Sequence, residues 1–167
     1  MGLNMSGKII IKSMFAWRVL VFGLLSAGSS ASSASSASDV TMNEVSVVQL
    51  QAKMASGELT ASVITRYYLD RIAKLNHQGP SLHAVIVTNS NALAIAQQLD
   101  DERSAGKVRG PLHGIPVILK DNIDTLDPMP TTAGSLALAE HFAKEDAFVV
   151  AQLRRAGAII LAKANLS

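Results

Sequence analysis

The fold is decided by residues 110–122, which read Gly-Pro-Leu-His-Gly-Ile-Pro-Val-Ile-Leu-Lys-Asp-Asn. The apolar run Val117–Leu119 lies between Pro116 and the polar pair at 121–122. A short apolar run bounded in this way is typical of a strand covered on both faces, as in an α/β sheet. Lys120 then falls at the carboxyl end of the strand, the edge of such a sheet where ligand sites gather.

The position of Lys120 allows two interpretations. If the strand end is desolvated, burial favours the neutral amine over the ammonium, and a neutral lysine acts as a general base. Alternatively, the aliphatic part of the side chain lies along the strand end and the ammonium reaches solvent. The residues around Lys120, taken alone, favour the second interpretation.

The residues after this strand predict a second strand parallel to it. Residues 122–144 form a long loop, and loops of that length inside a compact domain are usually functional or disordered. A helix is predicted from a cap at Asp146 to Ala156, with Gly157 ending it, and Ala158–Ala162 is a second apolar strand. A strand, a helix and a strand in this order form a crossover, which implies neighbouring parallel strands.

Two helices are predicted near the start of the folded part. Ser46 and Gln49 match a capping box, and apolar residues recur at helical spacing as far as Gly57. Thr60 opens a second helix, which the pair Gly79-Pro80 ends. The two helices are expected to pack as a hairpin. A strand at 82–88 and a helix at 92–103, capped by an asparagine at 89 or 91, complete an α/β fold.

The first 38 residues have the order of a secretory signal peptide. Basic residues precede the apolar run Val19–Leu25, and the Ala/Ser-rich tract Ser26–Ser38 follows it. We therefore expect residues 1–37 to be a signal peptide and linker, cleaved after an alanine at 31, 34 or 37, and the protein to be exported to the periplasm or medium. The apolar run is shorter than the roughly 20 residues of a membrane span. An uncleaved anchor is the alternative.

Charge and cysteine content exclude several classes of function. Three of the 15 basic residues and none of the 13 acidic ones lie in the first 38, so residues 39–167 carry a formal charge of −1. There is no basic stripe of the kind that binds nucleic acid. The chain has no cysteine, which excludes disulfides and thiolate chemistry. The oligomeric state cannot be inferred from the sequence.

The stretches 110–125, Met129–Ser135 (Met-Pro-Thr-Thr-Ala-Gly-Ser) and 146–166 together closely resemble the amidase signature family. The resemblance covers roughly residues 42–167. It implies an α/β/α fold around a mixed sheet, and hydrolysis of the C–N bond of a small-molecule amide through a serine acyl-enzyme. In that family the lysine that matches Lys120 is the base of a Ser-cisSer-Lys triad.

Both serines of the triad lie, in that family, beyond the point that matches residue 167. The resemblance therefore implies that residues 39–167 are a truncated N-terminal part of an amidase domain, inactive by themselves. The alternative is a non-catalytic secreted remnant that keeps the amidase-like fold as an interaction module. A Gly/Ser-rich segment encoded in frame after residue 167 would favour the enzyme.

Other polar residues near these motifs are weaker candidates for chemistry. Ser135 is expected to shape the pocket rather than attack the substrate. Gly134 precedes it, and a turn at this glycine is enough to explain the Thr-Thr-Ala-Gly-Ser stretch without a catalytic serine. Asp121 adjoins Lys120 and is expected to tune or orient the site, whereas Asp124 and Asp127 are expected to be solvated. Lys163 is expected to follow a strand as Lys120 does, within Ala-Lys-Ala-Asn where the resembling family usually has Gly-Lys-Thr-Asn.

No cofactor or metal site is expected. The four histidines, at 77, 83, 113 and 141, do not have the spacing of metal ligands on one helix. The aspartates that recur every third residue from 121 to 127 lack the glycine and terminal glutamate of a calcium-binding loop.

Overall fold

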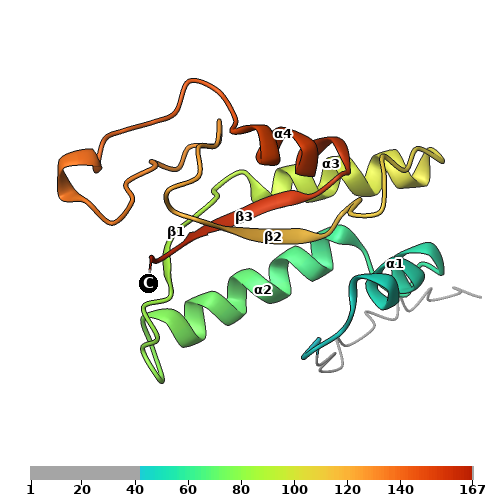
Figure 1. The fold of residues 1–167 in the computed structure, drawn as a ribbon. Coiled ribbons are helices and arrows are strands. Elements are labelled where there is room, and N and C mark those ends of the chain that lie inside the picture. Colours follow the sequence, from blue (N-terminus) through green and yellow to red (C-terminus); the bar gives the residue numbers. More distant parts are fainter. Residues whose placement is uncertain (1–41, 167) are drawn as a thin grey trace, which may run out of the picture. The chain divides into compact units, whose positions relative to one another are not determined.

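The computed structural model describes residues 42–166 (Figure 1). The predicted signal peptide and linker therefore lie outside the described residues. In chain order the elements are α1 (Val47–Ala55), α2 (Ala61–Asn76), β1 (Val85–Thr88), α3 (Ala92–Ser104), β2 (Pro116–Lys120), the 3₁₀ helix η1 (Leu136–Leu138), α4 (Phe148–Arg155) and β3 (Ile159–Ala164). No helix within residues 42–166 has the length and apolar character needed to cross a membrane.

The first two helices begin where the sequence predicts. The Ser46 hydroxyl accepts from the Gln49 backbone N–H, and the Gln49 side chain accepts from the Ser46 N–H at 2.9 Å, which is the predicted capping box. Thr60 caps α2 in the same way through the backbone N–H of Val63. One core contains buried side chains of both helices, and α2 packs most extensively against α3.

The strand predicted at 82–88 is shorter in the structure and begins at Val85. The N–H groups of Leu82 and His83 donate to the carbonyls of Leu75 and Asn76 at the end of α2. These two N–H groups are therefore bonded to the end of the helix and not to a neighbouring strand. The Asn76 side chain then both donates to and accepts from the backbone of Val85, at 2.8 and 2.9 Å. The end of α2 therefore determines where β1 begins.

The sheet has the strand order β1-β3-β2. β1 pairs antiparallel to β3, and β2 pairs parallel to it, which confirms both the mixed sheet and the crossover. β2 is an edge strand of this sheet, and its Ile118 is 42% exposed. Within residues 42–166, β2 is covered on the face of Leu119, but the face of Ile118 is partly exposed. The prediction of a strand covered on both faces is therefore not met by these residues.

Two separate groups of buried side chains cover the two faces of the sheet. The larger one joins α1, α2 and α3 to β3, through residues that include Ile64, Leu99 and Leu161. The smaller one joins α4 and the long loop to the other face, around Val150 and Met129. Figure 1 shows α2 and α4 on opposite sides of the sheet. The described chain thus has the helix, sheet, helix layering of an α/β fold.

An extra residue in β3 changes which of its side chains face α4. Val117 pairs with Ile160, but the next residue, Ile118, pairs with Ala162, so the parallel ladder has a bulge at position 161. Beyond the bulge Leu119 pairs with Lys163. Because partners in adjacent strands share a face, Lys163 lies on the same face as Leu119, the side of the sheet that packs on α4.

The helix before β3 starts differently from the prediction and ends as predicted. Ala147, not Asp146, is the N-cap residue of α4, and it makes no side-chain cap hydrogen bond. The prediction that Asp146 caps the helix is wrong, because the Asp146 carboxylate accepts instead from the Leu126 N–H at 2.8 Å and from Arg154. Gly157 follows the C-cap with a φ of +89°, which confirms it as the residue that ends the helix.

Candidate active site

Lys120 is the last residue of β2 and is exposed. Its Nζ donates to the backbone carbonyl of Asn165, just beyond β3, at 3.3 Å. Side chains alternate along a strand, so Lys120 shares a face with Ile118, which lines an apolar groove of about 210 Å³ with Tyr68, Ile72 and other residues of α2. The parallel strands β2 and β3 thus present Lys120 at their common carboxyl edge.

Asp121, the next residue, is fully buried and holds a turn against this edge. Its Oδ2 accepts from the backbone N–H of Thr132 at 3.1 Å and from the Thr132 hydroxyl. Its own N–H donates to the carbonyl of Ala164, and its carbonyl accepts from the N–H of Ala133. Asp121 therefore joins the end of β2, the end of β3 and the turn.

The turn at residues 131–135 has an unusual backbone. Ala133 has a φ of +49° and Gly134 a φ of +74°, so two consecutive residues adopt the left-handed conformation. This conformation costs roughly 1–2 kcal/mol for a residue with a Cβ, such as Ala133. The bonds from Thr132 and Ala133 to Asp121 offset that cost. Strained backbone of this kind is concentrated at functional sites, and Ser135 is exposed at the end of the turn.

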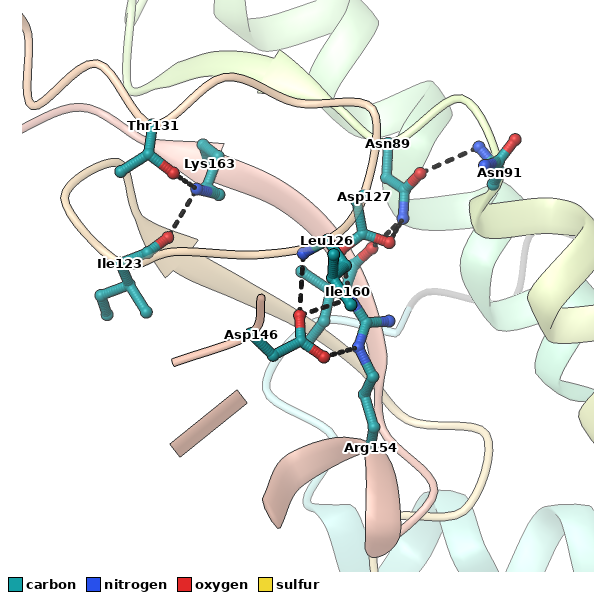
Figure 2. Close-up of polar contacts among 10 residues, drawn as sticks. All are labelled: Asn89, Asn91, Ile123, Leu126, Asp127, Thr131, Asp146, Arg154, Ile160 and Lys163. Atoms are coloured by element: carbon teal, nitrogen blue, oxygen red, sulfur yellow. Dashed lines mark hydrogen bonds and ion pairs between the residues drawn. The ribbon is translucent and has the colours of Figure 1, made fainter. Parts of the chain in front are cut away.

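Lys163 lies inside β3, not after it as predicted, and its side chain is completely buried. Its Nζ donates to the carbonyl of Ile123 at 2.6 Å and to the Thr131 hydroxyl at 3.1 Å (Figure 2). Burial lowers the pKa of the Lys163 ammonium below its ordinary value, while the carboxylates of nearby aspartates act in the opposite direction.

A network of charged groups fixes the long loop between β2 and α4. Arg154 forms ion pairs with Asp127 and Asp146, and Asn89 donates to Asp127 and to the carbonyl of Ile160, each at 2.8 Å (Figure 2). The Asp127 side chain is only 5% exposed, so the prediction that it is solvated is wrong. Burial alone would lower the pKa of Arg154, but its hydrogen bonds to the two carboxylates raise it.

The histidines do not gather in the structure. His113 is buried between the carbonyl of Leu99, 2.9 Å from Nε2, and the N–H of Arg109, which donates to Nδ1 at 3.2 Å. These partners assign the proton to Nε2 and give His113 a structural role. Across residues 42–166, no three side chains of His, Asp or Glu come together in a way that could hold a metal ion.

The buried cation at 163 and its loop contacts were missed by sequence reasoning. The available signal was the composition of the strand, because Lys163 lies between two alanines at the end of a run of buried apolar residues. A lysine in such a run marks either the end of the strand or a buried charge within it. The bulge at 161 determines that Lys163 faces the buried side of the sheet, and a bulge has no clear signature in this sequence.

A model of the Amidase family matches residues 63–167. A Schizosaccharomyces pombe protein named as an amidase is 46% identical over 129 residues, which are 77% of this chain and 22% of the relative. An Arabidopsis thaliana protein, also named as an amidase, is 41% identical over 151 residues, covering 89% of this chain and 29% of the relative.

The crystal structure of a peptide amidase from Stenotrophomonas maltophilia has the same fold. It superposes with a TM-score of 0.72 at 52% sequence identity, covering 75% of this chain and 25% of that one. The chain thus spans about a quarter of the length of the relatives it matches. The family match, the sequence identity and the superposition agree, and they show that the chain belongs to the amidase family.

Proposed function

We propose that the chain supplies the general base of an amidase that hydrolyses a carboxylic amide through a serine acyl-enzyme, and that this base is Lys120. The observation that carries the proposal is the position of Lys120, exposed at the common carboxyl edge of two parallel strands and followed by the buried Asp121. This edge is where α/β sheets bind ligands. The likeness to a peptide amidase supports an amide as the substrate.

The role of Lys120 in this mechanism is proton transfer. In the complete enzyme, with further chain covering this strand end, Lys120 accepts a proton from a bridging serine, which in turn accepts one from the nucleophilic serine. The nucleophile adds to the amide carbonyl carbon, the C–N bond breaks, and the amine leaves with the returned proton. Water then attacks the acyl-serine ester by the same relay, which releases the acid and restores the enzyme. Neither serine is assigned to a residue of this chain.

The experiment that tests the function compares two proteins on one panel of amides. The panel contains simple aryl and alkyl amides and a peptide carboxamide. We expect the complete enzyme, in which this segment is joined to the Gly/Ser-rich segment of the family, to release ammonia or amine. Residues 39–167 alone are expected to be inactive, because acyl transfer requires a positioned nucleophile.

Two outcomes of that comparison would contradict the proposal. Hydrolysis by residues 39–167 that Ser135→Ala abolishes would place the nucleophile within this chain. A complete enzyme without activity on any amide, although correctly folded, would favour the alternative of a non-catalytic module with an amidase fold.

We also propose that residues 1–37 direct export and are then removed. The support is the order of basic, apolar and small residues in this segment. N-terminal sequencing of the protein recovered outside the cytoplasm is expected to begin after an alanine at 31, 34 or 37. A soluble protein that still begins at Met1, Met5 or Met14 would contradict the proposal.

A further inference from the structure

The sheet separates two lysines that are close in the strand ladder. Lys120 lies on the face of Ile118, whereas Lys163 pairs with Leu119 and therefore lies on the opposite face, with α4. Without the extra residue at position 161, Lys163 would point toward the α2 side. The bulge thus places a positive charge directly behind the strand end that carries Lys120.

The burial of that charge is not explained by packing. An ammonium removed from water is destabilising unless it is paired, and an apolar side chain of similar volume often fills such a position at no loss of stability. Lys163 is completely buried, and the groups that favour its charged form are the carboxylates of Asp121, Asp124 and Asp127. The reason for a lysine at this position is therefore to be sought in the contacts of its ammonium rather than in the volume of its side chain.

Those contacts hold both ends of one segment of the long loop. Nζ donates to Ile123 at one end and to Thr131 at the other, so a single group on β3 closes residues 123–131 into a loop (Figure 2). The residue after Thr131 is Thr132, which donates twice to Asp121. A continuous set of contacts therefore runs from Lys163 through the turn to Asp121, which is bonded covalently to Lys120.

We propose that Lys163 is a positioning residue for Lys120: its buried ammonium anchors residues 121–134 to β3 and so fixes the strand end from which Lys120 projects. This inference rests on the proposed function of Lys120. Asp121 supplies independent support, because its Oδ1 is buried and has no hydrogen-bond partner among the described residues. The adjacent Lys163 cation offsets the cost of that buried negative charge.

The central test is Lys163→Met in the complete enzyme, because methionine keeps the unbranched aliphatic shape of the side chain, one atom shorter, and removes the charge. We expect kcat to fall about 10- to 100-fold with KM within about twofold, since a misplacement of about 1 Å in a catalytic group costs up to about 10²-fold in rate. Amide hydrogen exchange is expected to accelerate in residues 121–135 and to stay unchanged in α2. Lys107→Met, at an exposed lysine in another loop, is the matched control and should leave both measurements unchanged.

A milder variant covers the case in which Lys163→Met does not fold. Thr131→Val removes one acceptor of the ammonium and keeps the shape of the side chain. It is expected to lower kcat about 2- to 10-fold, the effect of one hydrogen bond, and to accelerate exchange in the same segment. Adding Asp121→Asn to Lys163→Met is expected to recover part of the lost kcat, because it removes the carboxylate left without its counter-charge.

The outcomes separate this inference from the proposed function. Wild-type kcat and wild-type exchange in Lys163→Met, or in Thr131→Val where Lys163→Met fails to fold, would overturn the anchoring role. Unchanged activity in Lys120→Ala would instead overturn the proposed function of Lys120, and with it the positioning role. In that case the exchange measurement still reports whether Lys163 holds residues 121–134.

Discussion

Replacing Lys120 by alanine in the complete enzyme is expected to lower kcat by at least about 10²–10⁴-fold, the contribution of a general base, and by more if the relay acts as a unit. The unfolding midpoint should hardly change, because the Lys120 side chain is exposed and its removal leaves no buried cavity. Steady-state kinetics on an amide substrate and a thermal unfolding curve together measure both effects.

Lys120→Arg distinguishes a base from a simple positive charge. Guanidinium stays protonated at every pH at which the protein is folded, so it keeps the charge but cannot accept a proton. We expect this variant to be almost as inactive as Lys120→Ala. Lys107→Arg, at an exposed lysine outside the site, controls for a general effect of the substitution. Near-native turnover in Lys120→Arg would refute the neutral-lysine mechanism and leave Lys120 as a lysine that only reaches into solvent.

Gly157→Ala is expected to destabilise the fold by about 2–5 kcal/mol. A left-handed φ, here +89°, costs a residue with a Cβ roughly 1–2 kcal/mol. In addition, a Cβ at Gly157 would lie 2.5 Å from the Cα of His113, and overpacking against backbone costs about 1–3 kcal/mol more. Urea unfolding followed by circular dichroism measures the loss as a lower midpoint.

Gly106→Ala is the matched control for that prediction. Gly106 also follows a helix and has a φ of +75°, but no atom lies within 4 Å of the position its Cβ would take. It should therefore lose only the conformational part, about 1–2 kcal/mol. Equal losses in the two variants would show that the approach of Gly157 to His113 is not a packing constraint.

Elements whose signals are local were predicted well from the sequence. The capping box at Ser46, the cap at Thr60 and the glycine at 157 each depend on a few adjacent residues, and all three are confirmed. The parallel pairing of β2 and β3 was also predictable, because the handedness and length of a strand, helix, strand connection leave few alternatives.

Features that depend on distant partners were not predicted. Asp146 has the composition of a helix cap, but Arg154 and the Leu126 N–H bind its carboxylate. Asp127 looks like a solvated loop residue until Arg154 and Asn89 are brought to it by the fold. The burial of Lys163 depends on one extra residue in β3. The assignment of Lys120 as the base stays a prediction that only the kinetics above can test.

The order of strands has a consequence for how this region is made. β3 lies between β1 and β2 in the sheet although it is the last of the three in the chain. During synthesis on the ribosome, neither β1 nor β2 has its native neighbour until residues 159–164 have emerged. The growing polypeptide therefore carries β1 and β2 without β3 while the intervening helices form, and unpaired strands of this kind are exposed to aggregation.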